Sequence, residues 1–460
     1  MTQATDAATS SPARGPRPGA ALAIGSLGFF LITLDILIVN VALTRIGAEL
    51  GGATAGKQWV IDGYTLLFAS LLLFAGNLSD TIGAKRAIAT GIGLFAITSA
   101  ACAGAPTLGA LIAARCVQGA SAALMLPASM ALIREAYPDP RRRARALGVW
   151  AVGGAVAGAL GPLVGGLLTT VSWRLVFGIN IPVCVAMLVL LLRVRRSPVR
   201  PSRFDWIGQL TAVVGLSALI SCLIQGGAEG FGTPPVISDG LLAIVGLAAF
   251  VLVERRVRQP MMPLSLFGSV GMRIALLVGF SFMVANFGTV FLVSLFVQQH
   301  LGLSPLVAGL LVFPTAIFSV VGNLASGPIT VRFGTRIPVV AGMVCMAVGV
   351  LGMFAVAPLN AAPAVTSLLV LTGAGGSVAM PSVTGIVLAS VPQELSGTAS
   401  AVFNTFRQVG GAVAIAVFGA LIADPARFVQ GMQVSLLIAA ALLVAAAIAG
   451  LRIRPLPAAR

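Results

Sequence analysis

Three charged residues lie inside long apolar stretches of this 460-residue sequence. Asp35 stands in LDILIVNVAL, Asp62 in WVIDGYTL and Arg115 in ARCVQG. A charged side chain at the centre of a bilayer costs roughly 2.5–3.5 kcal/mol on insertion scales, so we expect each to face a cavity or an opposite charge. An acid whose arginine partner can be released is able to take up and give back a proton. Asp35 with Arg115 is therefore the pair with the clearest capacity for proton chemistry.

The three charged residues lie at similar depth. Asp35 is eight residues from the end of the apolar stretch 21–43, and Arg115 is about six residues from the start of the stretch 109–133. At 1.5 Å per helical residue, both lie roughly 9–12 Å below the same surface. Asp62 is about five residues in from that surface. We expect Asp35, Arg115 and Asp62 to form a proton-coupling cluster. The alternatives are a purely structural ion pair for Asp35 and an interfacial position for Asp62.

The overall composition explains why these charges stand out. Hydrophobic residues make up 58% of the chain and charged residues 9%, and the mean hydropathy is +1.03. A soluble domain carries about 25% charged residues. A soluble fold could not bury this much apolar surface, so the sequence predicts an all-α polytopic membrane protein.

Fourteen apolar stretches are long enough to cross a bilayer as helices. An even number of spans places both chain ends on the same side of the membrane. The stretches lie near 21–43, 57–77, 87–105, 109–133, 146–170, 175–192, 206–225, 237–253, 273–298, 306–326, 337–357, 364–390, 398–423 and 431–451.

The basic residues predict which side holds the two ends. Of the 29 Lys and Arg residues, 23 fall on the face that carries the tails. Basic residues concentrate on the cytoplasmic side of membrane proteins, so we expect both termini to be cytoplasmic in a multi-pass protein of the cell (inner) membrane. The net charge of +16 is then a matter of topology and of attraction to anionic lipid, and it indicates no nucleic-acid partner.

The two halves of the chain repeat each other at an offset of about 251–257 residues, most plainly where VGGAVA at 152–157 returns at 409–414. Duplicated bundles are common in membrane transporters, with the substrate site between the repeats. We predict two six-helix bundles with an inserted two-helix hairpin. The expected division is a tail at 1–20, an N-terminal bundle at 21–193, a linker and inserted pair at 194–258, a C-terminal bundle at 259–452 and a tail at 453–460.

A charged, glycine-rich connection joins the second and third stretches. In GNLSDTIGAKR, the residues Gly76, Asp80, Gly83, Lys85 and Arg86 follow the spacing G-x-x-x-D-x-x-G-x-K-R. Glycine permits a turn with positive φ, and an acid beside two bases can pair within the hairpin or with a neighbouring helix end. The spacing returns without the acid in GPITVRFGTR, 251 residues downstream. Basic charge that only fixes topology is the alternative for either copy taken alone.

The C-terminal half carries one intramembrane arginine. Arg407 lies in the middle of stretch 398–423, and no acidic residue lies within the predicted stretches between 273 and 423. Four roles are open: a pair across the bundle, contacts to backbone carbonyls, a brace at the cytoplasmic end of a cavity, or a contact to an anionic substrate group. We expect a substrate cavity lined by Asn40, Gln118, Asn404, Arg407 and Gln408.

Several motifs resemble those of major facilitator transporters. RCVQG at 115–119 is similar to a motif of proton-coupled members, and the loop motif and its repeat are similar to the superfamily's connection between helices 2 and 3. A small-residue pattern in stretch 146–170 resembles the antiporter motif of its exporters. WRLVFGINIP, NTFRQVGG and LGLSPLVAGLLVFP extend the likeness to the fourteen-span drug:proton antiporters. The antiporter-motif residues are Gly158, Gly161, Pro162, Gly165 and Gly166.

That resemblance implies proton-coupled efflux of hydrophobic drugs or antibiotics by alternating access. It implies a proton gradient as energy source, no cofactor, no metal, and a monomer in a lipid bilayer that binds small hydrophobic drug-like substrates and protons. The absence of an acid in stretch 306–326 makes divalent cationic substrates a poor fit. The rival interpretations are a facilitator that imports a small solute and a non-transporting membrane sensor. No ATP-binding loop or catalytic motif is present, so we do not expect an enzyme.

Overall fold

The computed structural model describes residues 18–52, 54–195, 197–199, 205–257, 260–392 and 395–453. In these ranges, twelve helices are long and apolar enough to cross a membrane, and two bent helices bring the number to fourteen. The N-terminal bundle comprises α1 (Pro18–Leu50), α2 (Thr54–Ile82), α3 (Ala84–Ala103), α4 (Leu108–Ala136), α5 (Pro140–Val171), α6 (Arg174–Gly178) and α7 (Asn180–Leu191). The inserted pair is α8 (Trp206–Glu229) and α9 (Pro234–Arg256). The C-terminal bundle comprises α10 (Val270–Leu295), α11 (Pro305–Phe333), α12 (Arg336–Val356), α13 (Ala362–Ala389), α14 (Ser396–Leu421) and α15 (Phe428–Gly450).

Local sequence signals start these helices. Asp139 caps α5 by accepting a hydrogen bond of 2.8 Å from the backbone N–H of Arg142, and Pro140 follows at the first helical position. Ser304 and Pro305 begin α11 in the same way. A side-chain oxygen satisfies an unpaired helix N–H, and proline loses no helical hydrogen bond at this position.

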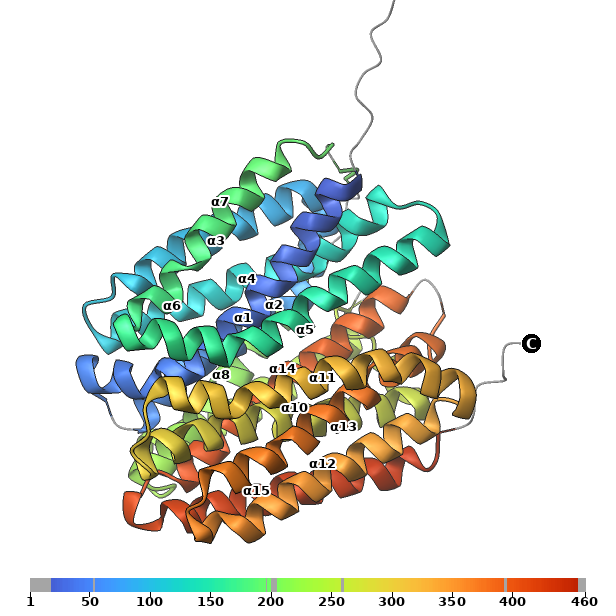
Figure 1. Ribbon diagram of the computed structural model, residues 1–460. Coiled ribbons are helices and arrows are strands. Elements are labelled where there is room, and N and C mark those ends of the chain that lie inside the picture. The colour runs from blue at the N-terminus through green and yellow to red at the C-terminus, as the bar shows by residue number, and fades with distance from the viewer. Residues whose placement is uncertain are drawn as a thin grey trace, which may run out of the picture.

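The two bundles lie side by side with their helices running in the same general direction (Figure 1). We call the end at which α1 begins the linker end, because residues 197–199 lie there beside the turn between α2 and α3. We call the end at which α1 finishes the far end. The bundles meet along two seams, one between α5 and α11 and one between α2 and α14.

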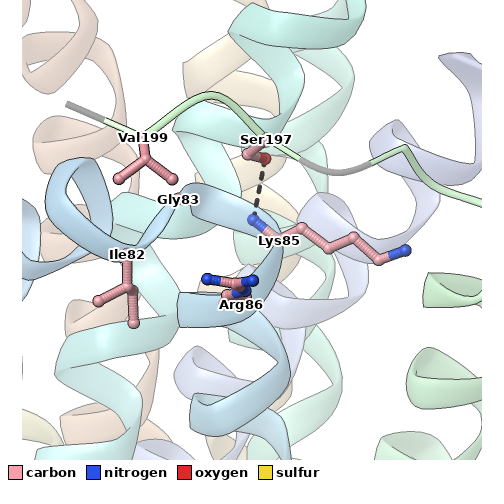
Figure 2. A pocket seen from close by; sticks show the side chains of 6 residues that line it. All are labelled: Ile82, Gly83, Lys85, Arg86, Ser197 and Val199. Atoms are coloured by element: carbon pink, nitrogen blue, oxygen red, sulfur yellow. Dashed lines mark hydrogen bonds between the residues drawn. The ribbon is translucent and has the colours of Figure 1, made fainter.

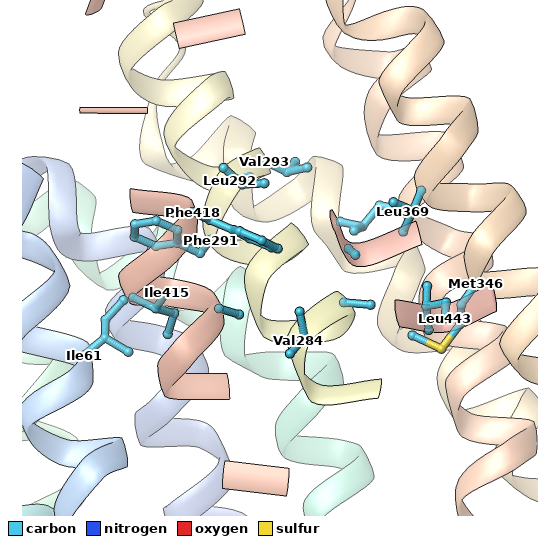
Figure 3. Packing of buried hydrophobic residues seen from close by; sticks show 14 of the residues in the cluster. Ile61, Val284, Phe291, Leu292, Val293, Met346, Leu369, Ile415, Phe418 and Leu443 are labelled. Atoms are coloured by element: carbon cyan, nitrogen blue, oxygen red, sulfur yellow. The ribbon is translucent and has the colours of Figure 1, made fainter. Parts of the chain in front are cut away.

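The apolar core is divided unequally between the two ends. One cluster joins the C-terminal bundle to the far-end half of the N-terminal bundle, and Figure 3 shows Ile61 of α2 beside Ile415 of α14 within it. A separate cluster, which includes Ile24, Phe68 and Leu132, fills the linker-end half of the N-terminal bundle. The bundles therefore share one continuous core at the far end.

Hydrogen bonds between the bundles follow the same distribution. Gln58 of α2 donates to the backbone oxygens of Ile415 and Ala416 at 3.0 and 2.8 Å, close to the far end. Nearer the middle, the hydroxyl of Thr405 donates to the backbone oxygen of Ala69 at 3.4 Å. The α2–α14 seam is therefore joined from its far end to about its middle.

The inserted helix α8 contacts both bundles. Gln209 donates a 3.0 Å hydrogen bond to the backbone oxygen of Ser70 in α2. Gly227 lies so close to Ala420 of α14 that an added Cβ would overlap it. Ile220 and Ile224 lie in a small apolar cluster with residues of α2 and α14. The insert thus covers the α2–α14 seam, while α9 presents many apolar side chains outward.

Helix α5 bends by 42° between its segments Arg145–Gly158 and Leu160–Val171. Pro162 lies within this helix. Proline removes one helical hydrogen bond and its ring crowds the carbonyl four residues earlier, which here belongs to Gly158. The bend lies where this effect predicts it.

Candidate functional site

Asp35 of α1 and Arg115 of α4 form an ion pair, and both side chains are completely buried. Arg115 also donates from Nε to the backbone oxygen of Val60 at 3.0 Å and from a terminal nitrogen to Gln118 Oε1 at 2.8 Å. Its guanidinium lies 4.3 Å from the ring centre of Tyr64, a distance at which a cation is attracted to an aromatic face. One terminal nitrogen has no hydrogen-bond partner.

Two amide side chains complete the surroundings of the Asp35 carboxylate. Asn180 of α7 donates to Oδ1 at 2.8 Å, and Gln118 donates to the same oxygen at 3.2 Å. Both amides also donate to Ser99 Oγ of α3, at 3.3 and 2.9 Å respectively. The carboxylate therefore accepts from Arg115 and from two amides, and α1, α3, α4 and α7 all contribute to the network.

Two features of the chain make this network possible. Gly119 lies so close to the backbone of Tyr64 that any side chain there would overlap it, so α4 can approach α2 closely enough for Arg115 to reach Val60. Asn180 lies at the start of α7 in the sixth span, where its amide reaches Asp35. Sequence reasoning did not select Asn180, although it stands in WRLVFGINIP. An uncharged amide in a motif of otherwise apolar residues was the available signal.

Asp62 does not join this network. Its side chain is fully buried, one oxygen accepts a hydrogen bond of 3.4 Å from Thr65, and the other has no partner. Asp62 is four residues from Gln58, so it lies on the face of α2 that is turned toward α14. Asp35 and Arg115 therefore form a pair, and Asp62 lies outside the expected three-residue cluster. Residues at equal depth in the membrane can lie on different helix faces.

Asn40 lies one turn beyond Asp35 on α1 and touches the opposite bundle. The hydroxyl of Ser294 in α10 donates to the backbone oxygen of Asn40 at 3.1 Å. Its own amide donates to the backbone oxygen of Ile36, and its buried Oδ1 has no partner. Asn40 thus lies at the contact between the bundles.

The arginine of the C-terminal bundle has no ion pair in the described part of the chain. Arg407 donates to Asn404 Oδ1 at 3.2 Å, and its Nε is buried without a partner. Its guanidinium lies 5.6 Å from the ring centre of Phe282 in α10 and 5.7 Å from that of Phe403. The neighbouring Gln408 is buried.

The charged connection between α2 and α3 is held by the linker that follows α7. Gly83 has φ 87°, and the second copy of the motif also turns at a glycine of positive φ, Gly334 at 76°. The backbone N–H of Lys85 donates to Ser197 Oγ at 3.0 Å, and Lys85 Nζ donates to the backbone oxygen of Val194 at 2.5 Å. Figure 2 shows Gly83, Lys85 and Ser197 around a cavity of about 140 Å³, which is also lined by Ile82, Arg86 and Val199.

The acid of this motif has a different environment. Asp80 is exposed, and no ion pair involves it among the residues that the structure describes. Gly76 lies within α2, where an added Cβ would be 3.9 Å from Pro127 of α4. Neither pairing considered for Asp80, within the hairpin or with a neighbouring helix end, is present as an ion pair among the described residues.

The antiporter-motif glycines of α5 bring helices into close contact. An added Cβ at Gly161 would lie 2.9 Å from Leu37 of α1, and one at Gly165 would lie 2.9 Å from the backbone oxygen of Ile38. Gly166 would meet the backbone oxygen of Pro305 of α11 at 2.8 Å, across the seam. Gly158 has nothing within 4 Å. Most of the motif thus serves close approach, both within the bundle and between bundles.

Pro162 takes part in the same contact from the other side. Gly309 of α11 lies directly against its backbone oxygen, so that a Cβ at Gly309 would overlap it.

Metal binding has no support in the described residues, where no group of three or more His, Cys, Asp or Glu side chains could hold an ion.

Comparison with known proteins agrees with this architecture. The description of the Major Facilitator Superfamily matches residues 25–415. The chain is 35% identical to a methylenomycin A resistance protein of Streptomyces coelicolor, over 93% of this chain and 91% of the relative. It is 34% identical to the multidrug resistance protein Stp of Mycobacterium tuberculosis, over 86% of this chain and 74% of the relative.

Solved structures show the same fold at low sequence identity. The chain superposes on a D-xylose–proton symporter with a TM-score of 0.68 at 16% identity, covering 95% of this chain and 98% of that one. It superposes on a peptide transporter POT solved in complex with sulfate with a TM-score of 0.70 at 16% identity, covering 93% of each chain. The motif resemblance, the matched residues and the two-bundle fold agree, and this multi-pass membrane protein belongs to the major facilitator superfamily.

Proposed function

We propose that this protein exports small hydrophobic drug-like molecules or antibiotics in exchange for protons, by alternating access between its two bundles. The observation that carries the proposal is the fully buried Asp35–Arg115 pair inside the N-terminal bundle. Relatives named as resistance proteins for methylenomycin A, tetracenomycin C and puromycin support the class of substrate.

Protonation of Asp35 is the proposed coupling step. A proton on this carboxyl removes the counter-ion of Arg115, which is buried and already has one nitrogen without a partner. Breaking a buried ion pair by removing one partner costs about 3–5 kcal/mol. Inverting a two-state population from 1:99 to 99:1 takes about 5.5 kcal/mol, so the two energies are of the same order. Protonation would thus strongly favour a conformation in which Arg115 finds other partners or water.

Drug and proton would bias the same two-state element in opposite directions. The drug favours the conformation with deprotonated Asp35, and the proton favours the other, so each promotes release of its competitor. The closed far-end seam, where Gly309 meets Pro162, represents one of these states. Access to the cavity would then come from the linker end. Asn40, Gln118, Asn404, Arg407 and Gln408 are the proposed cavity residues.

Asp62 is the proposed second proton site. Its carboxyl is buried on the face of α2 that is turned toward α14, with one oxygen unpaired. Opening of the far-end seam would bring water to this carboxyl. The proposal includes a monomer in the cell membrane with both termini in the cytoplasm, driven by the proton gradient without a cofactor.

A transport measurement tests the proposal. The intact chain is first expressed in a pump-deficient bacterial host, and a growth-inhibition panel selects the drugs to which it gives resistance. Uptake of these drugs is then measured in inside-out membrane vesicles with an imposed pH gradient. We expect raised resistance to at least one apolar drug, with accumulation that collapses when an uncoupler dissipates the gradient. Accumulation unaffected by the uncoupler would contradict proton coupling, and binding of drugs without any flux would favour a sensor.

A further inference from the structure

Arg407 carries an intramembrane positive charge that the proposed coupling step does not use. It lies eleven residues into α14, and its buried Nε has no hydrogen-bond partner. Its one side-chain hydrogen bond goes to a neutral amide oxygen, Asn404 Oδ1. Charged groups at membrane depth are costly and usually face a partner or a substrate pathway. Arg407 therefore has an unfilled requirement for negative charge.

No acidic side chain within the described structure meets that requirement. Helix α14 is continuous to Leu421, so Asp424 lies about 25 Å away along the helix axis. Asp35 is already engaged by Arg115 and two amides. Among the described residues no ion pair joins Asp62 to Arg407, and the Asp62 carboxyl accepts a hydrogen bond from Thr65. Arg407 lies against α10, where an added Cβ at Gly279 would lie 3.0 Å from its Cγ.

Two aromatic rings lie near the guanidinium. The ring centres of Phe282 and Phe403 are 5.6 and 5.7 Å from it. A guanidinium presents a planar fork of donors that matches the two oxygens of a carboxylate. Aromatic faces beside it would hold the flat apolar body of the same molecule. The combination fits a planar molecule that carries one acidic group.

We propose that Arg407, with Asn404, Phe282 and Phe403, forms a subsite for the anionic group of a planar aromatic substrate. The subsite deepens the proposed export function and rests on it for its physiological role. Binding itself does not require transport, so the subsite can be tested separately. Compounds that carry a carboxylate or an equivalent acidic oxygen are the expected class.

Matched acid and amide pairs test this subsite. The full-length protein in lipid nanodiscs is titrated by equilibrium dialysis with 2-naphthoate, 9-anthroate and biphenyl-4-carboxylate, each beside its neutral primary amide. We expect the wild type to bind at least one acid about tenfold more tightly than its amide, the scale of a charge-assisted hydrogen bond. Arg407→Gln should remove this preference while the amide affinity changes less than about twofold. Arg407→Lys, which keeps the charge but loses the fork, should retain part of it.

The control is Arg427→Gln, because Arg427 is 78% exposed beyond the end of the same helix. It should leave the preference unchanged. Equal affinity of the wild type for acid and amide in all three pairs would overturn the subsite, as would a preference that survives in Arg407→Gln. Acid-selective binding without proton-driven flux would keep the subsite and reject the export proposal. Proton-driven export of neutral drugs without acid selectivity would do the reverse.

Discussion

In the N-terminal bundle, the buried arginine is surrounded by partners: Arg115 has an acid, a backbone oxygen, an amide and an aromatic face. In the C-terminal bundle, Arg407 has one neutral amide and two phenyl rings. The two halves repeat a fold, yet within the described residues one holds a neutralised charge pair and the other a charge without an ion pair.

This difference suits the two bundles to different functions, proton coupling and substrate recognition. A neutralised pair can change its net charge by binding one proton, so the N-terminal bundle is suited to coupling. An unneutralised charge can only be satisfied by something that arrives from outside the bundle, so the C-terminal bundle is suited to recognition. A duplicated scaffold allows this because the helices supply equivalent positions while the side chains at those positions diverge.

The largest expected effect follows from removing the proton site. Asp35→Asn keeps the size and hydrogen-bonding capacity of the side chain but cannot exchange a proton. Drug uptake driven by a pH gradient into inside-out vesicles should fall by at least about two orders of magnitude, the scale of a lost proton-transfer group. Exchange of a neutral drug without a gradient should persist.

The matched control for this change is Asp239→Asn. Asp239 lies in α9 and accepts a hydrogen bond from Ser221, so the substitution alters an acid in the insert and leaves the bundles intact. Full gradient-driven transport by a well-expressed Asp35→Asn protein would show that the proton travels elsewhere, and Asp62 would be tested next.

The two arginines should respond oppositely when neutralised. Arg115→Gln leaves Asp35 buried without its counter-ion, which we expect to destabilise the protein by about 3–5 kcal/mol. Arg407→Gln removes a charge that forms no ion pair with any described residue, so stability should stay the same or rise. Thermal unfolding of both variants in one detergent measures the contrast. Equal losses of stability would mean that Arg407 has a counter-ion in the folded protein.

The far-end seam provides a test of the moving parts. A Cβ at Gly309 would overlap the backbone oxygen of Pro162, so Gly309→Val should oppose closure of this end. Turnover should fall by roughly tenfold, corresponding to a bias of about 1.4 kcal/mol on the two-state equilibrium. Spin labels at Val171 and Leu303 in a cysteine-free background would report a longer distance.

The control for the seam is Gly148→Val, because nothing lies within 4 Å of a Cβ at that position of α5, the helix on the other side of the seam. Normal turnover by Gly309→Val with an unchanged label distance would mean that the seam does not open during transport.

The smallest expected effect is at the loop acid. Asp80→Asn should leave the protein inserted and slow transport several-fold, because a latch of a few kcal/mol sets populations and does not build the binding site. Asp80 has no ion pair among the residues that the structure describes. We therefore expect the latch contact to form in the other conformation. Normal turnover by the well-folded variant would mean that the charges of this motif only fix the orientation of the helices in the membrane.

The sequence predicts the helices well because apolar length is a local property. Span number and the duplicated turn at Gly83 and Gly334 follow from runs of residues and from spacing. The contact between Asp35 and Arg115 could be anticipated because both charges are costly at membrane depth and opposite in sign. Because an unpaired charge at this depth is costly, the pairing can be predicted from the sequence alone.

Other parts of the site depend on information that a single sequence does not carry. Asp62 has the right depth but lies on a helix face directed at α14, and helix rotation is set by packing. Asn180 is neutral, so no energetic rule required it to meet Asp35. The position of α8 across the α2–α14 seam depends on contacts between distant segments, such as Gln209 with Ser70. Each of these follows from tertiary packing and not from local pattern.

The pairing of Asp35 with Arg115 also sets an order of events during synthesis. The two residues are 80 positions apart, so α1 leaves the ribosome well before its counter-ion exists. At a synthesis rate of about 5–20 residues per second, Asp35 waits roughly 4–16 s for Arg115 and longer for Asn180. During this interval the nascent α1 carries an acid with no partner in the bilayer. The roughly 2.5–3.5 kcal/mol cost of that acid is offset by the apolar residues of α1, whose mean hydropathy is 2.4. The first helix can therefore enter the bilayer alone, and Asp35 gains its counter-ion only when α4 arrives.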